Sequence, residues 1–240
     1  TLSLHDALPI WTCYEPRNRP IIECAWDQKP DLILASGDML SGDREEGDAI
    51  AVALLSRLSD LAPVCFVNGN HEMCVERHQP ERYQKFMDDL KNGGVQVLHN
   101  ETAWFWIDGE KVAVTGYELP WEYYRRFSRR HPSVVGMERS IGKRKQDAYQ
   151  ILLTHNPVFF EEYTAWGADF TFAGHLHGGF IRLPYFGGVI SPQFQLFPKY
   201  DHGLYQMDTS SMVVGAGMGN HSGLFRINNP TEVVTVRIKR

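Results

Sequence analysis

Long hydrophobic runs are absent from this sequence, and so is a strong excess of charge of one sign. No apolar run approaches the about 18 residues that a membrane-spanning helix needs. The 24 basic and 29 acidic residues leave a net charge of −5, which gives no general reason to expect a nucleic-acid partner. Internal repeats and low-complexity tracts are missing as well. A chain of 240 residues with this ordinary composition favours one α/β domain with a sizeable core.

Cysteine is also scarce. The chain has four cysteines, at positions 13, 24, 65 and 74, and no two of them form a Cys-x-x-Cys pair. Cys65 lies in an apolar stretch, where a buried free thiol is expected. This usage favours a reducing compartment over a disulfide framework.

What the sequence does contain is a repeated local pattern. A short apolar stretch predicts a buried strand, and polar residues able to bind a metal follow it at once. The four examples are 32–35 before Gly37-Asp38, 63–67 before Gly69-Asn70-His71-Glu72, 150–153 before Thr154-His155, and 169–173 before Gly174-His175-Leu176-His177. Because sites in an open α/β sheet form at the carboxyl ends of strands, these side chains are expected to meet.

Each example has a simpler explanation when it is taken alone. Asp38 can cap a turn, the polar run after Gly69 can cap the next helix, and a His-x-His pair often lies on a surface. Together, however, the four supply a carboxylate, an amide oxygen and several imidazoles. That ligand set suits Mn, Fe, Zn or Ni and differs from the all-oxygen cage of Ca. A carboxylate can also bridge two ions about 3.5–4 Å apart, and such a pair can clamp a phosphoryl group.

The segments between these motifs predict the rest of the fold. Apolar periodicity indicates helices over 21–28, 49–61 and 79–91. Strands are expected over 95–98, 103–108 and 111–115, with a hairpin turn at Asp108-Gly109, and closing strands over 204–207, 211–214 and 232–238. Residues 1–20 predict an irregular N-terminus, and residues 21–240 predict a single domain.

The four motifs, in this order, resemble the calcineurin-like metallophosphoesterase superfamily. The stretch from Gly174 through residues 181–184 to 197–200 and 203–205 is similar to its bacterial YkuE/YaeI-type branch. The resemblance implies an α/β fold, a four-layer α-β-β-α sandwich. It also implies hydrolysis of phosphomonoesters or phosphodiesters at a dinuclear site, through a metal-bound hydroxide. Two divalent ions, Mn, Fe, Zn or Ni, are the implied cofactors.

The resemblance also assigns roles to the motif residues. Asp38 would bridge the two metal ions, and Asn70, His155 and His175 would complete one site with it. His177 would belong to the other site. His71 would not bind metal but would act as general acid, or as a stabiliser of the leaving oxygen.

One departure from the family pattern changes these expectations. The family opens with a strand ending in Asp-x-His, which supplies two ligands to the second site, but no Asp-x-His precedes Asp38 here. His5 and Asp6 have the wrong order and spacing, although either is a candidate substitute. We therefore expect a non-native N-terminus, with the first strand missing or non-native. The chain is then expected to bind one ion. The alternative function is a catalytically impaired metal-binding or interaction domain.

The remaining features concern partners. Residues 125–145 are strongly basic, which is typical of a solvated helix and loop, and alternatively of a rim that attracts anionic substrates or an anionic membrane surface. With the aromatic loop over 187–200, this fits a small or lipid-linked phosphate ester and peripheral membrane association, as well as other substrates. The expected location is cytoplasmic or membrane-peripheral, with any anchor outside this chain. We interpret the histidines outside the motifs as surface or structural, with a substrate contact left open for His202.

Overall fold

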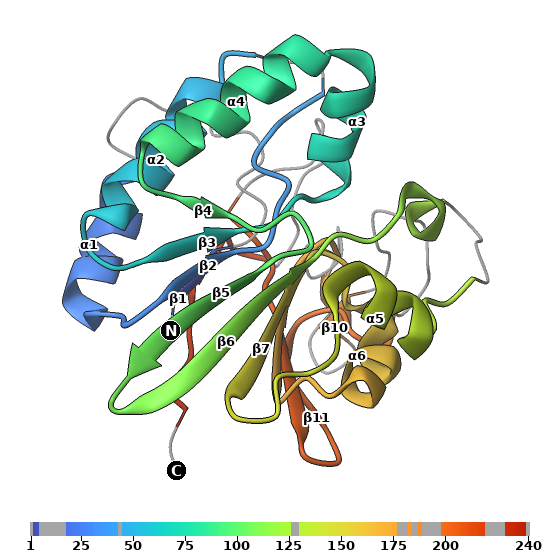
Figure 1. Ribbon diagram of the computed structural model, residues 1–240. Coiled ribbons are helices and arrows are strands. Elements are labelled where there is room, and N and C mark those ends of the chain that lie inside the picture. The colour runs from blue at the N-terminus through green and yellow to red at the C-terminus, as the bar shows by residue number, and fades with distance from the viewer. Residues whose placement is uncertain are drawn as a thin grey trace.

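The structure of this chain is a computed structural model, shown in Figure 1. It describes residues 2–4, 18–42, 45–125, 130–176, 182–183, 187–188, 198–218 and 229–238. Two sheets lie face to face, and helices cover the outer face of each, which gives the four-layer α-β-β-α sandwich (Figure 1).

The first sheet has five strands in the order β13-β1-β2-β3-β4. Their bounds are Leu2–Leu4 for β1, Ile33–Ala35 for β2, Val64–Phe66 for β3, Gln96–Val97 for β4 and Val234–Thr235 for β13. The sequence predicted a first strand that is missing or non-native, and the structure has a strand, β1, at that position. β1 pairs in parallel with β2, Leu2 opposite Ile33, and antiparallel with β13.

The second sheet has six strands in the order β11-β12-β8-β7-β6-β5. They are β5 (Thr102–Ile107), β6 (Glu110–Tyr117), β7 (Tyr149–Thr154), β8 (Phe170–Ala173), β11 (Gly203–Met207) and β12 (Ser210–Val214). A separate short ribbon pairs β9 (Arg182–Leu183) with β10 (Gly187–Gly188). The β5–β6 turn confirms the predicted hairpin, because Asp108 and Gly109 both have positive φ.

The helices form the outer layers. They are α1 (Asn18–Gln28), α2 (Asp48–Ser59), α3 (Asn70–His78), α4 (Pro80–Asn92), α5 (Val134–Ile141) and α6 (Phe160–Trp166), with 3-10 turns η2 (Trp121–Tyr124) and η3 (Pro157–Phe159). Residues of α1, α2 and α4 pack on the first sheet, and those of α5 and α6 on the second (Figure 1). Among the described residues, every helix is too short or too polar to cross a membrane.

The core follows from the period of two in each strand. Ile33 and Ala35 of β2 face α2 and α4, while Leu32 and Leu34 face the second sheet. Because both faces of β2 are covered, its residues are all buried, which explains why this stretch reads as an unbroken apolar run. The same holds for β3 and β8, so the strands that precede the polar motifs are fixed within the core.

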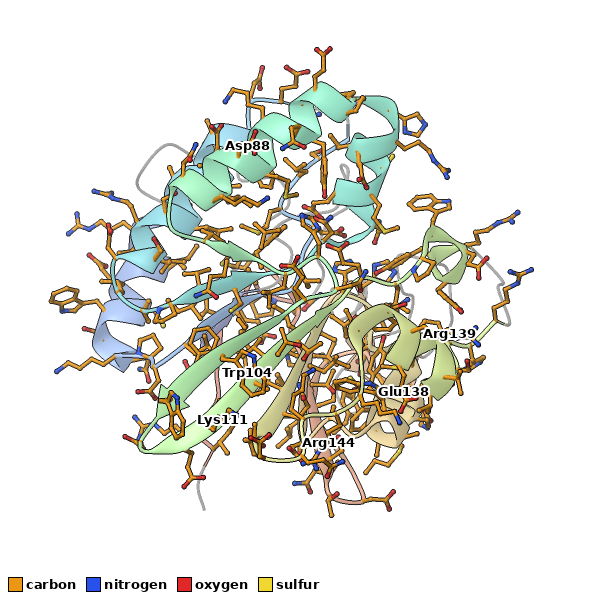
Figure 2. The ribbon with its side chains drawn as sticks, in the orientation of Figure 1. Asp88, Trp104, Lys111, Glu138, Arg139 and Arg144 are labelled. Atoms are coloured by element: carbon orange, nitrogen blue, oxygen red, sulfur yellow. The ribbon has the colours of Figure 1, made fainter. Side chains whose placement is uncertain are left out.

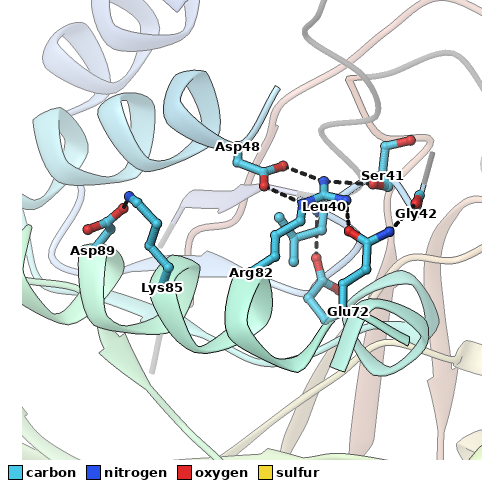
Figure 3. A network of polar contacts seen from close by, with 9 residues as sticks. Leu40, Ser41, Gly42, Asp48, Glu72, Arg82, Lys85 and Asp89 are labelled. Carbon is cyan, nitrogen blue, oxygen red and sulfur yellow. Dashed lines mark hydrogen bonds and ion pairs between the residues drawn. The ribbon is translucent and has the colours of Figure 1, made fainter. Parts of the chain in front are cut away.

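Ion pairs and a cation–π contact hold charged side chains on the outside of the fold. Arg82 on α4 donates to both carboxylate oxygens of Asp48 on α2, at 2.7 and 2.8 Å (Figure 3). On the β5–β6 hairpin, the Lys111 ammonium lies 4.4 Å from the centre of the Trp104 ring (Figure 2). Within the basic segment, Arg144 is paired with Asp169 and Arg130 with Glu122.

Candidate metal centre

The structure brings three of the predicted ligands together at the carboxyl ends of strands from both sheets. One ligand atom each from Asp38, His155 and His175 lies within 4.8 Å of the others. Asp38 follows β2, His155 follows β7, and His175 follows β8 across Gly174. All three are buried, so the chain places a carboxylate and two imidazoles in its interior.

The position of Asp38 depends on two glycines. Gly37 and Asp38 both have positive φ, at 93° and 56°, which turns the chain sharply after β2. A Cβ atom on Gly37 would overlap the backbone of Gly69, and one on Gly69 would overlap Oδ1 of Asp38. The loops after β2 and β3 therefore meet backbone to backbone, and only glycine allows this approach.

Glu72 fixes these two loops from inside the protein. Its Oε2 accepts hydrogen bonds from the backbone N–H of Asp38 and of Gly69, both at 2.8 Å. Its Oε1 accepts from the N–H of Leu40, also at 2.8 Å (Figure 3). Glu72 is the third residue of α3, so the bond to Gly69 is half of a capping box. One fully buried carboxylate thus satisfies three backbone donors around the cluster.

His155 is oriented by its outer ring nitrogen. Nδ1 lies 2.6 Å from the carbonyl oxygen of Ser36, which can only accept, so Nδ1 carries the proton. Nε2 lies 3.1 Å from Oδ2 of Asp38 and 3.1 Å from Nδ1 of His175, and it offers a lone pair to a metal ion when it gives up its proton. This is the arrangement in which a metal-binding histidine donates its other N–H to a carbonyl.

Asn70 and His71 begin α3 and lie beside the cluster. The backbone N–H of His71 donates to Oδ1 of Asp38 at 2.9 Å, and its ring Nε2 is 3.9 Å from Oδ2. The His71 side chain is 20% exposed, so it borders the site from the solvent side. Oδ1 of Asn70 is buried without a hydrogen-bond partner among the described residues. A buried acceptor of this kind is costly unless a donor or cation meets it.

The electrostatics of the two buried carboxylates differ. Burial by itself would raise the pKa of Asp38, but the imidazoles of His155 and His71 outweigh it and hold that pKa well below its usual range. Burial and the neighbouring charge of Asp38 raise the pKa of Glu72, against the lowering effect of its three N–H donors. A cation at the cluster would stabilise both carboxylates in their ionised forms.

Tyr124 is a residue of the site that the sequence did not predict. Its ring meets the His175 ring edge to face, with centroids 5.3 Å apart, and lies 6.0 Å from the His155 ring. It belongs to η2, which follows β6 in an aromatic stretch without helical or strand periodicity. By contrast, Glu72 lies in the predicted motif, and its spacing from Gly69 is a recognisable capping signal.

Three of the other predicted site residues lie outside the residues that the structure describes. His177, the ligand expected for the second site, lies outside the described residues, and so do His5 and Asp6. His202 is described, and its Nε2 lies 2.8 Å from Oε2 of Glu232.

Comparisons with known proteins agree with this geometry. A sequence profile of the family described as "Calcineurin-like phosphoesterase" matches residues 13–179. This chain belongs to that family. Within it, the chain is similar to bacterial proteins of the YkuE/YaeI type.

Two relatives and one solved structure define the similarity. The metallophosphoesterase YkuE of Bacillus subtilis is 25% identical over 195 residues, covering 80% of this chain and 62% of YkuE. The phosphodiesterase YaeI of Escherichia coli is 26% identical over 212 residues, covering 88% of this chain and 72% of YaeI. The NAD nucleotidase NadN of Haemophilus influenzae shares the fold with a TM-score of 0.58 at 16% identity, covering 90% of this chain and 44% of NadN. The chain therefore spans less than two thirds of the length of YkuE.

Proposed function

We propose that this chain is a metal-dependent phosphoesterase that hydrolyses phosphomonoesters or phosphodiesters at the Asp38–His155–His175 cluster. The observation that carries the proposal is the buried convergence of one carboxylate and two imidazoles from the two sheets. Membership of the calcineurin-like phosphoesterase family supports the general activity. Two divalent ions are the cofactors that the family implies.

The residues present fit a metal ion. Nε2 of His155 lies 3.1 Å from both Oδ2 of Asp38 and Nδ1 of His175, so one metal ion can take a ligand atom from each of the three residues. The buried Oδ1 of Asn70 has no hydrogen-bond partner among the described residues, which supports our assignment of Asn70 as the fourth ligand. A mixed set of nitrogen and oxygen ligands without thiolate suits Mn, Fe, Zn or Ni.

Each residue then has a separate task. Asp38, Asn70, His155 and His175 hold one ion, and Asp38 with His177 contributes to the second. When bound, such ions supply positive charge to the phosphoryl oxygens and lower the pKa of a water molecule. His71, next to Asp38 and partly open to solvent, is placed to give a proton to the leaving oxygen or to donate a hydrogen bond to it. Glu72 and the Ser36 carbonyl position the ligands without touching the substrate.

A second candidate is a domain that binds one ion and turns over slowly or not at all. It is favoured by one observation, that residues 1–37 contain no Asp-x-His. In this case the second site has only Asp38 and His177 from this chain, which is too few ligands for tight binding.

Metal per chain and activity, measured together, distinguish the two candidates. The chain is loaded with Mn and desalted, ions are counted by mass spectrometry, and hydrolysis of p-nitrophenyl phosphate and bis-p-nitrophenyl phosphate is followed. His175→Ala tests the cluster, and His131→Ala is the matched control, because His131 is 60% exposed and pairs with Glu162. Two ions with hydrolysis support the enzyme. One ion, lost only in His175→Ala, with no hydrolysis supports the second candidate. No ion in the unaltered chain overturns the metal site.

A further inference from the structure

A groove lies between α3 and η2, the two elements that carry His71 and Tyr124. It has a volume of about 300 Å³ and is lined by Met73, Cys74, Glu76, Arg77 and His78 of α3 and by Trp121 of η2. We refer to it as the α3–η2 groove. Its volume is at the lower end of the range for small-molecule pockets and is large enough for a flat two-ring group.

Both walls of this groove belong to elements that also border the cluster, α3 through His71 and η2 through Tyr124. On α3, His71, Cys74 and His78 are spaced three and four residues apart and so share one face of the helix. At a rise of about 1.5 Å per residue, Cys74 lies ~4.5 Å and His78 ~10.5 Å along the helix axis from His71. On η2, the Trp121 ring lies 6.5 Å from the ring of Tyr124, which in turn packs on His175. The groove therefore lies about one helical turn from His71, on the same face of α3.

The lining selects for shape and apolarity more than for charge. Trp121 is 39% exposed and offers an indole face, and Met73 is partly buried against the aromatic cluster around Tyr117. The charges of Glu76 and Arg77 are adjacent and opposite, so they give the groove no net preference for an anion or a cation. Nδ1 of His78 is already 2.8 Å from the Cys74 carbonyl oxygen. A flat aromatic group can stack on Trp121 and contact the Met73 sulfur, both of which are favourable arrangements.

We propose that the α3–η2 groove is the leaving-group subsite of the phosphoesterase and that it selects phosphate esters of flat aromatic alcohols. This inference rests on the proposed function. It assigns Trp121 as the residue that determines specificity, because Trp121 has the largest apolar side chain among the lining residues. His71, about one helical turn before Cys74 on the same face of α3, then meets the ester oxygen that joins the aromatic group to phosphorus.

The test uses two non-hydrolysable probes, 2-naphthylmethylphosphonate and methylphosphonate. Their affinities for the Mn-loaded full chain are measured by calorimetry. We expect the naphthyl probe to bind about tenfold more tightly, and Trp121→Ala to remove this preference while changing the affinity for methylphosphonate less than about twofold. Trp121→Phe keeps a ring in the groove and is expected to retain most of the preference. Trp104→Ala is the matched control, because Trp104 is similarly exposed, at 45%, on the β5–β6 hairpin (Figure 2).

Kinetics provide a second readout that a purely structural role would not change. For 2-naphthyl phosphate, Trp121→Ala is expected to raise KM about tenfold and leave kcat nearly unchanged, since the contact is made equally before and during the reaction. For ethyl phosphate neither constant should change. Comparing variant with unaltered chain for each substrate cancels the different intrinsic reactivities of the two esters.

The possible results distinguish a failure of the groove assignment from a failure of the proposed function. The proposed function stands if methylphosphonate binds and this binding is lost in His175→Ala. The groove assignment is then overturned if the naphthyl probe binds no more tightly than methylphosphonate, or if it still binds more tightly in both Trp121 variants. If neither probe binds the Mn-loaded chain, the proposed function fails and the groove assignment fails with it.

Discussion

The loops after β2 and β3 are held at the cluster by one carboxylate shared among three backbone donors and by backbone contact. Those after β7 and β8 are held by ring packing together with separate hydrogen bonds, such as that of His155 to the Ser36 carbonyl. On the first side, Glu72 accepts three backbone N–H groups, and Gly37 touches Gly69. On the second side, the rings of His155 and His175 lie 4.9 Å apart, and both lie against Tyr124. We call these the β2–β3 side and the β7–β8 side.

The difference shows where the site tolerates change. Hydrogen bonds to one carboxylate are directional, and the backbone N–H groups of Asp38, Leu40 and Gly69 all depend on the same Glu72 side chain. Ring contacts on the β7–β8 side are spread over many atoms, each of which contributes little. Small changes in shape should therefore be more costly on the β2–β3 side.

The largest effect is expected for Gly69→Ala. The added methyl group would overlap Oδ1 of Asp38, so either Asp38 or the loop after β3 must move. We expect the free energy of unfolding to fall by about 3 kcal/mol and Mn binding to be lost. Urea denaturation and metal counting measure the two effects.

Gly47→Ala is the control for this substitution. Gly47 precedes α2 with an ordinary φ of −77°, and no atom lies within 4 Å of the position that a Cβ would take. We expect a change below about 1 kcal/mol there. Equal effects of the two substitutions would show that the close approach at Gly69 does not constrain the site.

Glu72→Gln tests the shared carboxylate directly. The amide oxygen can replace only one carboxylate oxygen, and its NH₂ group would then face a backbone N–H, for example that of Leu40. We expect a loss of about 2 kcal/mol in the free energy of unfolding, together with weaker Mn binding. Glu76→Gln, one turn further along α3 and exposed, should stay within about 0.5 kcal/mol. A stable Glu72→Gln protein with unchanged Mn affinity would contradict the positioning role of Glu72.

A matched pair of hydroxyl deletions compares the two sides at similar cost. The Tyr83 hydroxyl lies 2.7 Å from the side-chain nitrogen of Asn68, two residues before Asn70, and the Tyr163 hydroxyl donates to the Asn156 carbonyl at 2.7 Å. Each Tyr→Phe change should lower the free energy of unfolding by about 1 kcal/mol. Only Tyr83→Phe should also weaken Mn binding, because the β2–β3 side has less freedom to adjust. Equal Mn affinities in the two variants would argue against a difference between the sides.

The sequence predicted the strands and the ligands at their ends, but it did not predict most of the contacts that hold those ligands in place. The family resemblance and the apolar runs together predicted the four-layer fold, and the strand-end motifs predicted that Asp38, His155 and His175 would meet. The Asp108-Gly109 hairpin is also confirmed. These features follow from local residue patterns combined with one rule of sheet topology.

What the sequence did not predict depends on tertiary contacts. Residues 1–10 lack a strand pattern, yet Leu2–Leu4 pair between β2 and β13, because neighbouring strands supply the hydrogen-bond partners. Tyr124 reaches His175 from a segment with no periodic pattern. His177 lies outside the described residues, so the second half of the predicted site stays a prediction.

The smallest effect is expected at a contact between the β2–β3 side and the end of β6 in the second sheet. Oε1 of Glu118, just after β6, lies 3.0 Å from Nδ1 of His99 and accepts from the backbone N–H of Asn68 at 3.3 Å. The hydrogen bond to Glu118 raises the pKa of His99 above its usual value. Since the folded protein holds this proton more tightly than the unfolded chain, the pair stabilises the fold fully below the unfolded pKa of about 6.5.

This stabilisation should disappear as the pH rises through the higher pKa of folded His99. The side chain of His99 is 35% exposed, so solvent screening limits the effect to less than about 1 kcal/mol. Urea denaturation of the unaltered chain and of His99→Gln should therefore show a difference in unfolding free energy at pH 5.5 that shrinks by pH 8.5. A difference that does not depend on pH would mean that His99 acts through packing alone. In that case the Glu118 carboxylate would contribute to stability through its hydrogen bond from the Asn68 N–H and not through its contact with His99.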